Sequence, residues 1–84
     1  MKVSIIGLGY IGLPTAAVMA SHGMEVIGVD TNPHVVSTIN EGKVHIVEPD
    51  LEILVKETVN NGKLIATQEI SASDVFIIAV PTPF

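Results

Sequence analysis

Three glycines with a fixed spacing are the residues of this chain that most directly suggest chemistry. Gly7, Gly9 and Gly12 stand in the segment Gly-Leu-Gly-Tyr-Ile-Gly. In such a segment the first glycine permits a tight turn, the second lets the backbone approach a pyrophosphate, and the third lets a helix pack closely on a sheet. Phosphates would lie at the helix N-terminus, where free N–H groups and the helix dipole attract anions without Lys or Arg. The spacing therefore predicts a dinucleotide-binding loop.

A carboxylate follows this loop at a suitable distance. Asp30 ends the apolar run 26–29 and lies close to the position, about 20 residues beyond Gly12, of an acid that binds the adenosine ribose. A carboxylate there repels a 2′-phosphate. The chain has no arginine, and no lysine lies between Asp30 and Lys43 to hold such a phosphate. These residues predict NAD rather than NADP as the cofactor.

Two other interpretations of the N-terminal segment must be weighed. A GxGxxG segment alone can be a glycine-rich turn without function, but here an apolar run precedes it and Asp30 follows it, as a dinucleotide site requires. Lys2 and the apolar stretch up to Ala20 also resemble a secretory signal peptide. A signal peptide explains neither the glycine spacing nor Pro14 nor Asp30. A transmembrane helix fits less well still, because the stretch barely reaches a spanning length and contains three glycines.

Composition restricts the class of protein. Its 84 residues allow at most one small domain. The chain is 48% hydrophobic and 15% charged, and its wealth of Val and Ile is typical of a parallel sheet buried on both faces, which needs helices on each side. The net charge is −5 and the four lysines are not clustered, so we expect neither a nucleic acid nor a membrane as partner. The expected partner is a small molecule.

Metal and thiolate chemistry are not expected. The chain contains no cysteine, which excludes thiolate catalysis, disulfides and Cys-ligated metal within it. His22, His34 and His45 are isolated from one another, twelve and eleven residues apart in the sequence. We therefore predict no metal site.

Apolar runs alternate with turn residues in a pattern that predicts four strands and three helices. The strands are expected at 2–6, 24–30, 63–67 and 75–80, and the helices at 11–21, 33–40 and 50–60. Segment 43–48 alternates like a short strand, but Pro49 stops it, so we interpret it as a connector. This order predicts an α/β fold, a Rossmann-type parallel sheet of about four strands in the order 3-2-1-4 with flanking helices and right-handed crossovers.

The predicted strand order brings the glycine loop and the end of the fourth strand to one crevice, where open α/β sheets bind ligands. Thr82 lies there between Pro81 and Pro83. Its hydroxyl or backbone would reach a cofactor, or the residue would simply form a turn between two prolines. The residues themselves favour neither role.

Four segments, 6–16, 26–30, 44–51 and 78–84, together resemble the UDP-glucose/GDP-mannose dehydrogenase family. The sequences His-Ile-Val-Glu-Pro-Asp-Leu and Ala-Val-Pro-Thr-Pro-Phe are more specific for it than the glycine loop. The resemblance covers the whole chain but only the beginning of a family member. It implies that residues 1–84 form the N-terminal part of an NAD-binding Rossmann domain, and that the rest of that domain, a dimerisation region and a UDP-sugar domain lie outside them.

By this resemblance the whole enzyme oxidises the 6-hydroxymethyl group of a nucleotide sugar to a carboxylate in two NAD-dependent steps, with a cysteine nucleophile. That cysteine is absent here, so we assign no catalytic residue and expect residues 1–84 alone to be inactive. The whole enzyme is expected to be a cytoplasmic homo-oligomer of polysaccharide biosynthesis. The resemblance places Tyr10 and Ile11 at the pyrophosphate through backbone N–H groups, and Thr82 near the nicotinamide. The expected cofactor-binding residues are then Gly7, Gly9, Tyr10, Ile11, Gly12, Asp30 and Thr82.

Other roles stay open at this point. Glu48 lies in a family motif and either contacts a ligand, caps the following helix or orders the connector. A regulatory module that senses NAD without catalysis would keep the glycine loop and Asp30. An FAD-binding flavoprotein fits less well, because a longer acid usually ends its second strand. The coding sequence beyond Phe84 would distinguish the enzyme, with its cysteine, from the regulatory module.

Overall fold

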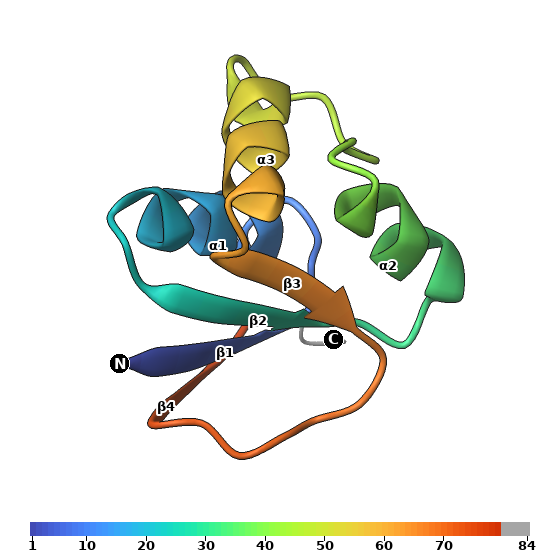
Figure 1. Cartoon of the computed structure of the whole chain (residues 1–84). Helices are drawn as coiled ribbons and strands as arrows, with labels where there is room; N and C mark the ends of the chain where they lie inside the picture. The colour runs from blue at the N-terminus through green and yellow to red at the C-terminus, as the bar shows by residue number, and fades with distance from the viewer. Residues whose placement is uncertain (80–84) are drawn as a thin grey trace.

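A computed structural model describes residues 1–79 and shows a four-stranded sheet with three helices (Figure 1). The sheet order is β3-β2-β1-β4 and every pair of strands is parallel. This confirms the predicted fold class and strand order. The elements are β1 (Lys2–Ile6), α1 (Gly12–Ser21), β2 (Glu25–Val29), α2 (Pro33–Asn40), α3 (Leu51–Asn60), β3 (Leu64–Thr67) and β4 (Val75–Ile78).

The boundaries follow local chemistry. Asn32 caps α2, because its side chain accepts a hydrogen bond of 2.9 Å from the His34 N–H, and Pro33 occupies the first helical position. Gly62 follows α3 with a φ of 81°, a conformation in which a glycine can end a helix. The segment between α2 and α3 contains neither helix nor strand, as predicted.

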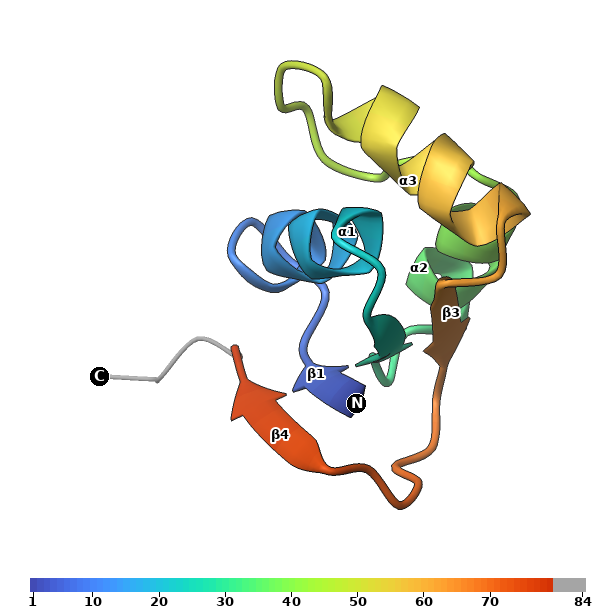
Figure 2. The same ribbon diagram turned by 60° about the vertical axis from the view of Figure 1, so that its left-hand side comes forward.

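All three helices lie on one face of the sheet (Figures 1 and 2). The expectation of helices on each side was therefore wrong for the described residues. β2 and β3 are added one after the other on the same side of β1. Right-handed crossovers between strands added in this way place their helices on the same face of the sheet. The crossover from β3 back to β4 is the connector 68–74, which forms no helix. Several large side chains on the opposite face are exposed, with Ile65 at 54%, Phe76 at 48% and Ile78 at 74%, whereas Ser4 in the middle of that face is buried.

The core lies between the sheet and the three helices, each of which contributes buried residues to it. Val3 and Ile5 of β1 are fully buried against small residues of α1, Ala16 and Ala17, which permit close approach of helix and sheet. Leu8 of the glycine loop fills the space beside Gly28 of β2, where a Cβ atom would lie 2.7 Å from the Leu8 Cδ2 atom. The loop is thus anchored in the core through Leu8, although its next residues face solvent.

β4 is a short strand that pairs with β1 alone among the strands of residues 1–79. Its register pairs Val3 with Val75 and Ile6 with Ile78. The strand was expected to continue to residue 80. The Ala79 N–H still donates to the Ile6 carbonyl at 2.7 Å, so the ladder reaches residue 79, the last that the structure describes.

Candidate cofactor-binding site

The glycine loop turns from β1 into α1 through three glycines in different environments. Gly7 has a φ of 98°, and its N–H donates to the Val29 carbonyl at 2.7 Å. A Cβ atom on Gly12 would lie 1.7 Å from the Gly7 carbonyl oxygen, so the loop packs directly on the start of the helix. A Cβ atom on Gly9 would meet nothing within 4 Å. Gly7 and Gly12 therefore have packing roles, whereas Gly9 borders open space that a ligand can enter.

The start of α1 is free to bind an anion. Ile11 is the N-cap residue and makes no side-chain cap, and the first turn contains no acid. Within residues 1–79 the backbone N–H groups of Tyr10 and Ile11 donate no hydrogen bond. Both side chains are exposed, Tyr10 at 68% and Ile11 at 72%. Backbone donors and the positive end of the helix dipole thus meet solvent at one place.

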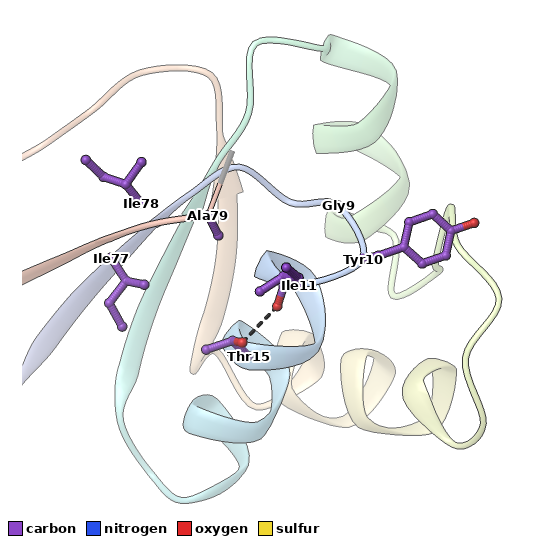
Figure 3. Close-up of a pocket in the computed structure, with 7 residues that line it drawn as sticks. All are labelled: Gly9, Tyr10, Ile11, Thr15, Ile77, Ile78 and Ala79. Carbon is purple, nitrogen blue, oxygen red and sulfur yellow. Dashed lines mark hydrogen bonds between the residues drawn. The ribbon is translucent and has the colours of Figure 1, made fainter. Parts of the chain in front are cut away.

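A cavity of about 460 Å³ lies between the glycine loop and the end of β4 (Figure 3). The Thr15 hydroxyl donates to the Ile11 carbonyl at 2.8 Å and fixes the first turn of α1 on one wall. Figure 3 shows the Tyr10 ring pointing away from β4, so it does not fill the cavity. The lining residues are Gly9, Tyr10, Ile11, Thr15, Ile77, Ile78 and Ala79. The loop and the fourth strand therefore meet at one crevice, as their adjacency in the sheet requires.

Asp30 joins the glycine loop to α2. Its Oδ2 atom accepts a hydrogen bond of 3.1 Å from the Leu8 N–H, and its Oδ1 atom accepts one of 2.9 Å from the Asn32 N–H. A carboxylate has about four acceptor positions, so each oxygen keeps one for a further donor. The carboxylate is therefore fixed in orientation and still able to accept hydrogen bonds.

The residues match a known family over their full length. A model of the UDP-glucose/GDP-mannose dehydrogenase family, NAD binding domain, matches residues 1–84. The chain belongs to this family. The resemblance expected from the sequence motifs is thereby confirmed, and so is NAD as the cofactor of the matching domain.

Individual relatives agree with this assignment. The chain is 63% identical over 83 residues to UDP-N-acetyl-D-mannosamine dehydrogenase of Campylobacter jejuni, covering 99% of the chain and 20% of the relative. It is 62% identical over 82 residues to NDP-N-acetyl-D-galactosaminuronic acid dehydrogenase of Ralstonia nicotianae, covering 98% of the chain and 19% of the relative. The chain thus spans about a fifth of the length of these relatives.

Solved structures show the same fold. UDP-N-acetyl-mannosamine dehydrogenase Cap5O from Staphylococcus aureus superposes with a TM-score of 0.95 at 47% identity, over 99% of the chain and 20% of Cap5O. GDP-mannose dehydrogenase from Pseudomonas aeruginosa, solved as a ternary complex, gives a TM-score of 0.95 at 42% identity, over 99% of the chain and 20% of that enzyme. The Rossmann-type architecture of this member of the family is confirmed.

A second cavity beside Asp30 contains residues that the sequence did not single out. It measures about 180 Å³ and is lined by Ile6, Gly7, Val29, Asp30, Thr31, Gln68 and Ile70. The Gln68 side chain donates to the Thr31 carbonyl at 3.1 Å and ties the connector after β3 to the loop after β2. Gln68 and Ile70 lie between the predicted strands 63–67 and 75–80, in neither a predicted strand nor a predicted helix. Their signal was their place just after β3, because carboxyl ends of parallel strands share one edge of the sheet.

Glu48 and Thr82 are two further residues of the family motifs. The Glu48 carbonyl accepts from the Leu51 N–H at 3.3 Å, and α3 has no side-chain cap, so the Glu48 carboxylate does not cap that helix. Glu48 instead lines a pocket of about 130 Å³ with Pro14 of α1. Thr82 lies outside the described residues, so its expected role near the nicotinamide stays a prediction.

Residues 1–79 contain no group of three or more His, Asp or Glu side chains that could hold a metal ion. None of the helices formed there is long and apolar enough to cross a bilayer.

Proposed function

We propose that this chain binds the adenosine and pyrophosphate half of NAD at the carboxyl edge of β1 and β2, as the N-terminal part of the NAD-binding domain of a nucleotide-sugar dehydrogenase. The observation that carries the proposal is the position of Asp30. Its carboxylate receives N–H groups from both the glycine loop and the start of α2, and it keeps free acceptor positions toward solvent. This is the arrangement that a ribose diol beside a bound pyrophosphate needs.

The pyrophosphate would lie at the start of α1. Tyr10 and Ile11 would donate their backbone N–H groups to it, and the open space beside Gly9 would let the phosphate oxygens approach the main chain. Gly7 and Gly12 would support this site by shaping the turn. None of these contacts needs a cationic side chain.

The same geometry supports NAD over NADP. Two backbone N–H groups near Asp30, those of Leu8 and Asn32, already donate to its carboxylate. A 2′-phosphate would therefore meet a negative charge and find no spare donor among them. Among the described residues, those that line the cavity beside Asp30 include no Lys or Arg.

NAD, when bound, supplies an acceptor for hydride at its nicotinamide ring. The apolar cavity between Ile11, Ile77 and Ala79 would shield the nicotinamide side of the cofactor from water. Thr82 would contact that side. We assign no catalytic residue to the chain.

The proposal for the whole protein rests on its relatives. We propose that the whole protein is a UDP-N-acetyl-D-mannosamine dehydrogenase. It would oxidise the 6-hydroxymethyl group of UDP-N-acetyl-D-mannosamine to a carboxylate, producing UDP-N-acetyl-D-mannosaminuronate with two NAD. It would act in the cytoplasm as a homo-oligomer in polysaccharide biosynthesis. The alternative of a regulatory NAD-sensing module finds no support among the relatives, whose names are those of dehydrogenases.

Isothermal titration calorimetry on the purified chain tests cofactor binding directly. We expect weak binding of NAD and of ADP-ribose, and binding of NADP at least about tenfold weaker, because an unfavourable contact of about 1.4 kcal/mol suffices for that ratio. Equal affinity for NADP would contradict the role of Asp30. This chain alone should produce no NADH from UDP-N-acetyl-D-mannosamine and NAD. Measurable NADH would contradict our proposal that residues 1–84 contain no catalytic residue.

A further inference from the structure

The last residue of α2 is bonded to the middle of an edge strand. The Asn40 Nδ2 atom donates to the Ala66 carbonyl at 2.9 Å, and the Asn40 Oδ1 atom accepts from the Ala66 N–H at 2.9 Å. Both hydrogen bonds are partly buried. One side-chain amide thus satisfies the donor and the acceptor of one backbone residue.

The N–H and C=O groups of Ala66 point away from β2, toward the free edge of the sheet. In a strand, successive residues direct their N–H and C=O groups to alternate sides. The carbonyls of Lys63 and Thr67 accept from β2, from the N–H groups of Val26 and Asp30 respectively. Residues 63, 65 and 67 therefore face β2, and residues 64 and 66 face the free edge. Asn40 occupies at Ala66 the place that a residue of a fifth strand would take.

Apart from its length of only four residues, β3 carries none of the sequence features that commonly protect an edge strand. Natural edges carry lysines, prolines, bulges or inward-pointing charges. The sequence of β3 is Leu-Ile-Ala-Thr, without charge or proline. Its Ile65 side chain is 54% exposed on the face that no helix covers. Without a cover this strand would offer an apolar, uncharged template for pairing.

We propose that Asn40 closes the β3 edge of the sheet against strand addition by a second copy of the chain. Its amide mimics a peptide group of a neighbouring strand and ends the ladder at Ala66. The two copies would otherwise pair β3 with β3 antiparallel, since a two-fold axis reverses the strand direction. β3 lies at the edge opposite β4, so a strand added beside β4 leaves this edge unprotected.

Cysteine cross-linking measures pairing at this edge. The chain has no cysteine, so a single Ile65→Cys substitution, the β3 reporter, reports on that strand alone. A second substitution, Ile78→Cys, is the β4 reporter and lies where the side chain is 74% exposed. Each reporter is combined with Asn40→Ala, and dimer formation with a short bis-maleimide is followed at equal protein concentrations.

The matched control is Asn60→Ala. Asn60 is also the last residue of a helix, and within residues 1–79 its side chain makes no hydrogen bond. We expect N40A to raise the rate of cross-linking at the β3 reporter about tenfold, the ratio that a protection of about 1.4 kcal/mol gives. Cross-linking at the β4 reporter should not change, and N60A should change neither rate.

Two results would overturn the proposal: an unchanged rate at the β3 reporter in N40A that is folded by circular dichroism, or an equal rise in N60A. Amide exchange at Ala66 provides a second measurement, because removal of the Asn40 acceptor should expose that N–H. If N40A does not fold, Asn40→Ser replaces it, since a hydroxyl is too short to bridge both groups of Ala66. The same rise at the β3 reporter is expected, and its absence in folded N40S contradicts the proposal.

Discussion

The Leu8 N–H donates a hydrogen bond of 3.1 Å to the Asp30 carboxylate, which joins the glycine loop to the end of β2. Leu8 is itself fully buried beside Gly28. The position of the Asp30 carboxylate is therefore coupled to the hydrophobic core through one residue of the loop. The loop and the acid, recognised separately in the sequence, form one unit in the fold.

Asp30→Ala should abolish most of the NAD binding of the chain. Hydrogen bonds to a charged acceptor contribute about 1.5–3 kcal/mol each, so loss of the ribose contacts should weaken affinity at least about tenfold. Calorimetric titration with NAD measures the change. Glu57→Ala, which removes an exposed carboxylate of α3, is the control and should leave the affinity unchanged. An unaltered affinity in D30A would exclude the ribose role.

Gly9→Ala should separate binding from folding. The new Cβ atom meets nothing within 4 Å, so the melting temperature should stay close to that of the parent chain. The same atom would project into the space where the pyrophosphate approaches the main chain, and NAD affinity should fall at least about tenfold. Thermal unfolding and calorimetry on one sample test both halves. Retained affinity would place the phosphates elsewhere.

Gly12→Ala should have the opposite profile and destabilise the fold. Its Cβ atom would lie 1.7 Å from the Gly7 carbonyl oxygen, a backbone atom that cannot move without distorting the turn. Overpacking of this kind commonly costs about 1–3 kcal/mol or more. Denaturant unfolding followed by circular dichroism should show a midpoint well below those of the parent and of G9A. A midpoint equal to that of G9A would contradict the packing role of Gly12.

Most elements of the fold could be predicted because their signals are local. Asn32 and Pro33 mark the start of α2 through capping chemistry, and Gly62 marks the end of α3 through its positive φ. The strand order followed from the alternation of strands and helices. The glycine loop and Asp30 were found for the same reason, since each function depends on residue type and spacing.

Features that depend on distant contacts were missed. Asn40 and Ala66 are 26 residues apart, and nothing near either residue in the sequence predicts their two hydrogen bonds. Gln68 reaches Thr31 over 37 residues in the same way. The uncovered face of the sheet was also missed, because the Val and Ile content reports that strands are apolar but not which face the helices cover.

Asp50→Ala should lower the free energy of unfolding by about 1 kcal/mol. Asp50 precedes α3 and has a φ of 63°, in the left-handed region. Asp tolerates this backbone conformation better than Ala does. Asp50→Gly should be no less stable than the parent chain, because glycine adopts this conformation without strain. Urea unfolding of the three proteins gives the order. Equal stability of D50A and the parent would contradict the role of the backbone conformation here.

Within residues 1–79 no strand pairs with the outer side of β4, and this edge should cause the isolated chain to associate. Its strand is Val-Phe-Ile-Ile, with Phe76 48% exposed on the face that no helix covers, and unpaired edges of this kind favour pairing. Phe76→Lys should reduce association, because a charge on an edge strand opposes docking of a second strand. Light scattering over a range of concentrations measures the mean mass. Ile53→Lys on α3, where the side chain is 66% exposed, is the control for added charge and should leave association unchanged. A monomeric parent chain at all concentrations would refute pairing at β4.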